Sequence, residues 1–240
     1  MSEAEPTKGH RPGARERNRA EVMAQIMTAG RRALAEHGAD GLSLRAVARE
    51  VGMVSSAVYR YVASRDELLT LLIIESYDAV GAVAERAAAG GGSAVQRFVA
   101  VAMAVRDWGR AHPHEYALLH GSPVPGYRAP DDTITAGTRV PAALIGLLVE
   151  EYAAGRLSVP VASEGPPVSE ELSRQCDSVR DFFGSDLPDE LVLRGVSAWT
   201  HVYGLISFEL FGQFRNSFEP ADDLLELQFE RIAAHLGVQS

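Results

Sequence analysis

Residues 46–62 read AVAREVGMVSSAVYRYV. The apolar residues of this stretch fall into two short groups at helical spacing, separated by Gly52, and glycine suits the left-handed turn that ends a helix. Two short helices joined by such a turn form a helix-turn-helix, whose second helix enters the major groove of DNA. The stretch therefore predicts a DNA-reading element, although the chain carries a net charge of −9.

The side chains that hold these two helices in place are apolar or aromatic and recur on one face. They are Leu44, Val47, Ala48 and Val51 in the first helix, and Val58, Tyr61 and Val62 in the second. Ser43 precedes the first helix, and we expect its hydroxyl to cap that helix. The other side chains of the second helix are expected to face solvent or a groove: Ser55, Ser56, Ala57, Tyr59 and Arg60.

Basic side chains are concentrated around this motif. Residues 1–65 hold 11 Lys and Arg against 7 Asp and Glu, a net charge of +4, whereas residues 66–240 hold 12 against 25, a net charge of −13. A protein that meets a polyanion through one part needs positive charge only there. Charge alone is equally compatible with a solvated surface, so the asymmetry supports the motif without replacing it.

The overall composition is that of a globular protein, with 46% hydrophobic and 23% charged residues among 240. No apolar run approaches the roughly 18 residues of a membrane span. The polar start of the chain lacks the apolar stretch of a signal peptide. Cys176 is the only cysteine and can form no internal disulfide, so we expect a reducing, cytoplasmic compartment.

Helical periodicity continues along the rest of the chain. Residues 1–16 are expected to be a mobile basic arm, whose arginines suit phosphate or minor-groove contacts. The pattern then predicts helices over 17–37, 44–51, 55–61, 64–89, 93–111, 113–120, 133–154, 169–183, 188–215 and 221–236. Alternating β-branched runs are almost absent, and Pro160 argues against the nearest one, RLSVPVA. We predict an all-α fold of about ten helices.

Residues 42–68, LSLRAVAREVGMVSSAVYRYVASRDEL, resemble the DNA-binding region of TetR-type regulators. The shared features are the hydroxyl of Ser43, the turn at Gly52, the aromatic pair Tyr59 and Tyr61, and the basic-acidic pair that begins at Arg65. The resemblance covers about residues 17–75 closely. It implies an N-terminal helix-turn-helix domain over 17–75, with its motif at 43–62. A long helix would join this domain to a helical ligand-binding and dimerisation domain over 76–240.

The resemblance also implies roles for single residues. Ser43, Tyr59, Tyr61 and Arg65 would hold phosphates, while Arg45, Ser55, Ser56, Ala57 and Arg60 would face bases. Three positions depart from the family pattern. Val54 stands where Ser or Thr usually caps the reading helix, so Ser55 is expected to cap it instead. Ser56 stands where Gly is common, and Tyr61 where His is common.

The segment AWTHVYGLISFELFGQF, residues 198–214, is apolar nearly all round a helix and must be covered on two sides. We expect a pocket or core on one side and a partner subunit on the other. The expected dimer contacts are Gly204, Phe208, Phe211, Leu224, Leu227, Ile232 and Leu236, packed as a four-helix bundle. Trp199 followed by Tyr203-Gly204 also resembles a signature of one TetR subgroup, with Tyr203 in place of its His.

Polar aromatic side chains recur in the same part of the chain, including Tyr127 and His201. Those expected to line a pocket are Trp108, His112, Tyr116, His120, Trp199 and Tyr203. An apolar cavity with a few such polar tips suits a small, largely apolar effector, although each residue could instead be an ordinary core aromatic. His112, His114 and His120 do not lie on one helix face, so we expect no metal and no cofactor. Cys176 is expected to be a small buried hydrophobe.

The leading hypothesis is a homodimeric repressor that binds palindromic operator DNA and is released by a small molecule. An activator of the same fold is an alternative within that class. The rival from another class is an all-α enzyme or interaction protein in which the helix-turn-helix is incidental. Against an enzyme, the GGGS run at 90–93 lacks the Lys and Ser or Thr of a phosphate-binding loop.

Overall fold

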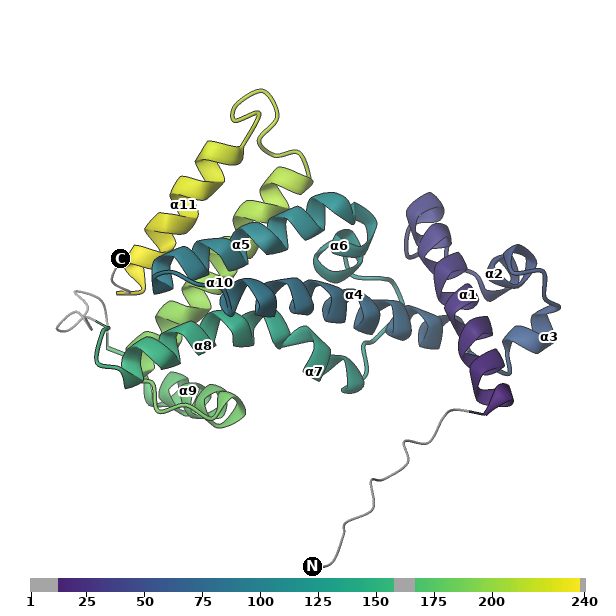
Figure 1. Cartoon of the computed structure of the whole chain (residues 1–240), viewed down its shortest axis with the longest axis horizontal. Helices are drawn as coiled ribbons and strands as arrows, with labels where there is room; N and C mark the ends of the chain where they lie inside the picture. Colours follow the sequence, from purple (N-terminus) through teal and green to yellow (C-terminus); the bar gives the residue numbers. More distant parts are fainter. Residues whose placement is uncertain (1–12, 158–166, 238–240) are drawn as a thin grey trace, which may run out of the picture. The chain divides into compact units, whose positions relative to one another are not determined.

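The computed structural model describes residues 13–157 and 167–237, and in these ranges every regular element is a helix (Figure 1). The all-α prediction is therefore confirmed. Eleven helices lie within the described ranges, against about ten expected. Residues 1–12 of the expected arm lie outside the described residues, as do residues 158–162 of the RLSVPVA run.

The described chain forms two compact units, which we call the head unit and the body unit. The head unit comprises residues 13–72 together with Val124–Tyr127, and the body unit comprises residues 73–123 and 128–237. The short Val124–Tyr127 segment comes from the middle of the chain. Within the head unit the hydroxyl of Tyr127 lies 2.9 Å from that of Thr70. Tyr127, which the sequence placed in the sensing region, thus belongs to the head.

The head unit is built from α1 (Ala14–His37), α2 (Leu44–Glu50), α3 (Ser55–Val58) and the first two turns of α4 (Arg65–Ala88). Its core consists of apolar side chains at helical spacing: Ile26, Ala29, Ala33, Leu34, Leu44, Val47, Ala48, Val58, Val62, Leu68, Leu69 and Leu72. Helix α1 ends at Gly38, as predicted, and begins at Ala14, before the expected Arg17. The apolar stripe read from the sequence is the face that packs.

Two local signals fix the path of the chain around α3 and α4. Gly52 has a φ of +69°, the left-handed value predicted for the turn after α2. Before α4, the Oγ of Ser64 accepts a hydrogen bond from the amide of Glu67 at 3.0 Å, as the capping pattern predicts. The carboxylate of Glu67 accepts from the amide of Ala63 rather than that of Ser64.

The body unit contains the rest of α4 and seven further helices. These are α5 (Ala94–Ala111), α6 (Pro113–His120), α7 (Asp132–Gly137), α8 (Arg139–Ala153), α9 (Glu170–Phe183), α10 (Asp189–Leu210) and α11 (Asp222–His235). Helix α5 packs against α8, α10 and α11, and α10 also packs against α9 (Figure 1). Ser93 and Ser169 cap α5 and α9 through their hydroxyls, and of these two caps the sequence predicted that of Ser169. No described helix combines the length and apolarity needed to cross a bilayer.

Helix α4 is held in the body unit by both packing and charge. Val80 and Ala84 are buried in the body core. The guanidinium of Arg139, at the start of α8, donates to both carboxylate oxygens of Glu85 at 2.7 and 2.6 Å, and to the carboxylate of Asp78 at 2.8 Å. These bonds hold the pKa of Glu85 below its usual range. The later turns of α4 therefore belong firmly to the body.

Besides the start of α1, three further helix boundaries differ clearly from those predicted. The helix expected over 133–154 is divided at Thr138 into α7 and α8, because Pro141 has no amide hydrogen to bond the carbonyl of Gly137. Helix α10 ends at Leu210 rather than near Arg215, and Gly212 there takes a φ of +77°. Helix α3 ends at Val58, and residues 59–61 continue the chain as turns. The four residues of α3 make little more than one helical turn.

Candidate functional site

The helix-turn-helix of the head unit is anchored by a few buried side chains. Val47 and Ala48 of α2 and Val58 and Val62 at α3 are at most 1% exposed. Tyr61 is half-buried, and the guanidinium of Arg19 from α1 lies over its ring at 5.2 Å. Arg19 is thereby held beside the reading helix, where its charge adds to that of the motif.

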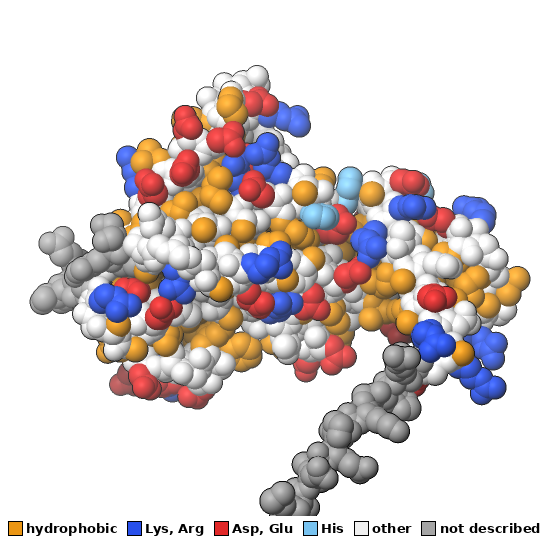
Figure 2. Space-filling model, in the orientation of Figure 1, with side chains coloured by type: hydrophobic (Ala, Val, Ile, Leu, Met, Phe, Trp, Pro, Cys, Tyr) orange, Lys and Arg blue, Asp and Glu red, His pale blue; other side chains and the backbone are white. Residues whose placement is uncertain are grey.

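The side chains expected to read bases lie on the accessible side of α2 and α3. Arg45, Ser56 and Arg60 are exposed, and Ser55 and Ala57 are half-buried. Arg45 and Arg60 form no hydrogen bond or ion pair with any described residue, so both guanidinium groups are free for a ligand. Figure 2 shows arginine side chains over the head unit. The structure thus brings together the groups that the sequence assigned to bases.

The side chains expected to hold phosphates divide into two kinds. Tyr59 is 49% exposed, in keeping with an external contact. Arg65 instead donates within the head unit, from Nη2 to the carbonyl of Ala39 at 2.8 Å and from Nε to that of Leu42 at 3.2 Å. These bonds fasten the start of α4 to the loop between α1 and α2. A phosphate contact by Arg65 stays a prediction, and its positioning role was not identified from the sequence.

The caps of α2 and α3 differ from the expected ones. Ser43 occupies the N-cap position of α2, but its hydroxyl makes no capping bond, which leaves it available to another acceptor or donor. The N-cap of α3 is Val54, without a side-chain cap, and Ser55 is the first helical residue. The expectation that Ser55 caps α3 is wrong, because Val54 itself adopts the extended cap conformation. Val54 is 71% exposed.

In the body unit, four of the six expected pocket residues come together. The ring of His120 lies 4.8 Å from that of Tyr116 and 4.4 Å from that of Tyr203, and the ring of Trp199 lies 6.1 Å from that of Tyr203. A residue not identified from the sequence joins them: the ring of Tyr77, from α4, lies 6.3 Å from that of His120. The available signal was its place on the apolar stripe of α4 that includes Ile73, Val80 and Ala84.

We call Tyr77, Tyr116, His120 and Tyr203 the phenol–imidazole cluster. Burial lowers the pKa of His120 to about 4, so its ring is neutral at pH 7. Burial raises the pKa of Tyr116 to about 12, against the opposing hydrogen bond with Ser207. Burial, and then the neighbouring Tyr116 and Tyr77, raise the pKa of Tyr203. The cluster is therefore uncharged.

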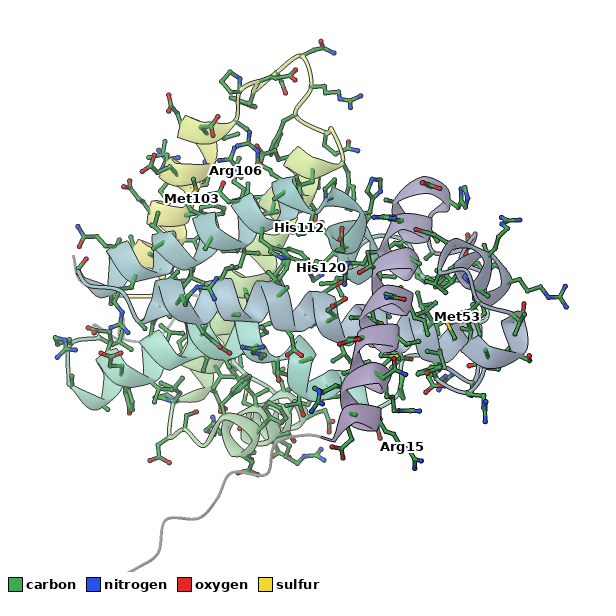
Figure 3. All side chains as sticks on the ribbon, turned by 45° about the vertical axis from the view of Figure 1, so that its right-hand side comes forward. Arg15, Met53, Met103, Arg106, His112 and His120 are labelled. Atoms are coloured by element: carbon green, nitrogen blue, oxygen red, sulfur yellow. The ribbon has the colours of Figure 1, made fainter. Side chains whose placement is uncertain are left out.

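The other two expected pocket residues form a separate pair. Trp108 is buried, and His112 stacks on it with ring centroids 5.2 Å apart (Figure 3). The Nδ1 of His112 lies 2.9 Å from the carbonyl of Trp108, and the rest of its side chain is exposed. The ring contacts of the cluster include neither residue. His112 serves as the C-cap of α5, a position that faces outward.

The residues expected at a dimer interface lie on α10 and α11. Phe208, Phe211 and Leu227 are 54%, 44% and 44% exposed, and Gly204 faces open space. Leu224 and Ile232 are half-buried against the body core, and Leu236 is buried in it. Between α10 and α11 lies a groove of about 370 Å³, lined by Ala198, His201, Leu205, Gln228, Arg231, Ile232 and His235. The exposed part of this set forms an apolar surface.

Residues 13–157 and 167–237 contain no group of three His, Cys, Asp or Glu side chains placed to hold a metal ion. Cys176 is buried, and burial is the main cause that raises its pKa, so the thiol is a poor nucleophile.

Arg60 supports a first prediction. Replacing Arg60 with alanine should cost ~1–3 kcal/mol of operator affinity and relax discrimination at one base step, because an exposed, unpaired guanidinium is lost from the reading helix. Stability should stay within about 0.5 kcal/mol, since Arg60 has no partner in the described structure. Competition binding with operators substituted one base pair at a time measures the effect.

Arg65→Ala is the matched comparison. It should weaken binding to all sequences about equally and lower the salt slope by about one phosphate. It should also destabilise the head unit, because the carbonyls of Ala39 and Leu42 lose a charged donor. A reversed pattern, with Arg65 setting base preference and Arg60 acting uniformly, would contradict the orientation assigned to α3.

Two family models match the chain. Residues 26–72 match the tetR family of bacterial regulatory proteins, and residues 98–232 match a tetracyclin repressor-like C-terminal domain. The first match contains the helix-turn-helix, and the second covers most of the body unit together with Val124–Tyr127 of the head unit. Members of this family are transcriptional regulators and not enzymes, so the enzyme alternative is set aside.

Similar proteins agree with these matches. The chain is 43% identical over 207 residues to the HTH-type transcriptional regulators Mb1846 of Mycobacterium bovis and Rv1816 of Mycobacterium tuberculosis, covering 85% of this chain and 87% of each relative. The crystal structure of SCO4313 superposes with a TM-score of 0.76 at 32% identity, over 92% of this chain and 100% of that one. A protein of unknown function from Rhodococcus sp. RHA1 shares the fold, with a TM-score of 0.67 at 23% identity over 90% and 95%. The chain therefore belongs to the TetR family of transcriptional regulators, with a DNA-binding helix-turn-helix in its head unit.

Proposed function

We propose that the protein is a homodimeric repressor that binds palindromic operator DNA in the cytoplasm and is released by a small, largely apolar effector. The observation that carries the DNA-binding part is the reading helix. Val58 and Val62 fix it to the head core, while Arg45 and Arg60 remain exposed and unpaired within the described residues. A rigid element with free donors on its outer side suits direct contact with base edges.

The apolar surface of α10 and α11 supports the proposed dimer. Phe208, Phe211 and Leu227 are large apolar side chains exposed on two helices that pack against each other, and exposed apolar patches commonly mark protein–protein interfaces. A second copy of the chain would pair like with like about a two-fold axis. Two reading helices could then occupy half-sites one helical turn apart, about 34–36 Å along the DNA.

Release by an effector is supported by helix α4. Its first two turns belong to the head unit, its later turns lie in the body core, and Tyr77 belongs to the uncharged cluster. With about 1.5 Å of rise per residue, the helix spans roughly 36 Å. A ligand that shifts its body end would change the spacing of the two reading helices and weaken operator binding.

A gel shift with the DNA upstream of the protein's own gene tests the DNA-binding part. We expect a sequence-specific complex on a palindrome and poor binding to one half-site. Competition with unrelated DNA of the same length is the control, and equal binding to both would overturn the proposal. In vitro transcription from that promoter separates the repressor from an activator: a repressor lowers transcript yield when it binds.

Release has a thermodynamic signature. The coupling between effector and operator is expected to be ~1–3 kcal/mol, and by linkage each ligand must weaken the other by the same factor. Titrating the effector into protein with and without operator measures both affinities. If the effector binds equally tightly in both titrations, its binding site is uncoupled from the reading helices.

A further inference from the structure

The phenol–imidazole cluster contains polar groups that the protein itself leaves without partners. In the described part of the chain, every fully buried polar side-chain atom has a hydrogen-bond partner. The hydroxyls of Tyr77 and Tyr203 and the ring nitrogens of His120 bond to no described residue. These atoms therefore cannot be fully buried: each must face space that water or a ligand reaches.

The same side chains are nevertheless enclosed by protein. Burial raises the pKa values of Tyr77 and Tyr203 and lowers that of His120. The ring of His120, on α6, lies 6.3 Å from that of Tyr77 on α4 and 4.4 Å from that of Tyr203 on α10. Side chains that are largely buried yet keep accessible polar tips are of the kind that line ligand-binding recesses.

Tyr116 shows what an ordinary core tyrosine of this unit looks like. Its side chain is 0% exposed, and its hydroxyl lies 2.9 Å from the Oγ of Ser207, so its polar group is satisfied. Tyr77 and Tyr203 have neither property. Within this cluster Tyr116 is therefore an ordinary core residue, whereas the hydroxyls of Tyr77 and Tyr203 are donors that have no acceptor among the described residues.

We propose that the phenol–imidazole cluster is the effector site of this regulator and that it selects an uncharged aromatic or apolar ligand bearing a hydrogen-bond acceptor. The proposal rests on the proposed effector response and adds to it the place and the chemical class of the ligand. The hydroxyls of Tyr77 and Tyr203 and the neutral ring of His120 supply up to three donors for a carbonyl, ester or ether oxygen. The aromatic rings supply the stacking faces.

The electrostatics of the cluster exclude an ionised ligand. The pKa shifts of its four residues arise from burial, from neighbouring tyrosines and from Ser207, with no carboxylate or guanidinium among the causes. A ligand carboxylate or ammonium would lose its water and meet no opposite charge, which is strongly unfavourable. Neutral phenols and a neutral imidazole solvate an ester oxygen at much lower cost.

Tyr77 links this site to the reading helices. It lies on α4, beyond the two turns that belong to the head unit, so a ligand bound to its hydroxyl contacts that helix directly. Its ring also lies beside Gly137 at the end of α7, where an added Cβ would be in ordinary van der Waals contact with the ring, at 3.5 Å.

Matched probe sets on one ring system test the ligand class with the full-length protein. For phenyl, naphthyl and biphenyl rings, we would measure binding of the methyl ester, the carboxylate, the aminomethyl compound and the parent hydrocarbon by calorimetry. We expect saturable binding of at least one ester and binding of its two ionic counterparts weaker by about a hundredfold. A carboxylate that binds as tightly as its ester, or no ester that binds, would overturn the proposal.

Tyr77→Phe and Tyr203→Phe test the assignment of the site. Each removes one hydroxyl and keeps the ring, so ester affinity should fall about threefold to tenfold while affinity for the parent hydrocarbon stays unchanged. Tyr152→Phe, an exposed tyrosine of α8 outside the cluster, is the matched control and should bind the ester as the wild type does. Unchanged ester affinity in both cluster variants would place the ligand elsewhere.

A separate measurement distinguishes this proposal from the regulatory one. Operator binding of the ligand-free protein is measured by gel shift. The ester that binds in calorimetry is then added, and the gel shift is repeated. If the ester binds the cluster but operator affinity does not change, the effector response fails while the site stands. If operator binding is sequence-specific but no ester binds, the site assignment fails while the DNA-binding function stands.

Discussion

Replacing Arg106 with methionine should lower the free energy of unfolding by about 2–4 kcal/mol. Arg106 is a charged residue of α5 that is only 1% exposed (Figure 3). Its Nε and Nη2 donate to the two carboxylate oxygens of Glu209 at 2.6 and 2.5 Å, and Nη1 donates to Asp222 at 2.9 Å. The arginine thus joins the last turn of α10 to the first turn of α11.

The large cost arises from the group that is left behind. Without Arg106 the carboxylate of Glu209, whose side chain is 17% exposed, stays partly buried without its main counter-charge. Asp222 is 53% exposed and can return to water. The loss of its ion pair with Arg106 is therefore screened by solvent and adds little to the cost in stability. Because neither carboxylate is fully buried, the expected cost lies at or below the usual range for a broken buried pair.

Two comparisons isolate this effect in urea unfolding. Adding Glu209→Gln to Arg106→Met should restore part of the lost stability, because the uncompensated charge is removed. Arg174→Met breaks an exposed pair with Glu171, whose side chains are 72% and 62% exposed, and should cost less than about 1 kcal/mol. If Arg106→Met and Arg174→Met cost the same, the buried network does not stabilise the body unit.

Changing Phe208 and Leu227 to aspartate together should convert the proposed dimer to monomers and lower operator affinity about a hundredfold or more. Both side chains are large, apolar and about half exposed, at 54% and 44%. In a two-fold interface each substitution acts twice, so four carboxylates would be buried against apolar surface without partners. A monomer holds one half-site only and loses the gain from simultaneous engagement.

Sedimentation velocity and gel shifts on the same samples check this prediction. Phe182→Asp is the matched control, because Phe182 is 56% exposed but belongs to α9. It should remain dimeric and bind operator normally. If Phe182→Asp dissociates the protein and the double variant does not, the subunits associate through α9.

Much of this protein follows from sequence periodicity and local stereochemistry. The stripe of α1, the faces of α2 and α3, the turn at Gly52 and the caps at Ser93 and Ser169 are all visible in the sequence, because each depends on residues a few positions apart. These local signals were sufficient for the all-α fold. Together with the family resemblance they located the helix-turn-helix.

The sequence could not assign residues whose role depends on a distant partner. Arg65 bonds to the carbonyls of Ala39 and Leu42, and nothing near it in the chain announces that contact. Trp108 and His112 are polar aromatic residues like those of the cluster, yet they stack on each other. Tyr77 joins residues from two other helices. Periodicity shows which face of a helix is buried, but it does not show which other helix packs against that face.

What the sequence determined by itself is therefore the set of helices, most of their ends and the reading motif, since hydrogen bonds and side-chain spacing within a few turns decide them. Only the tertiary structure decided that the rings of Tyr77 and Tyr203 both lie against that of His120, and that Val124–Tyr127 belongs to the head unit. The physical reason is that these associations depend on how helices far apart in the chain pack together. Several packings satisfy the same apolar stripes, and the fit of all the side chains at once selects one.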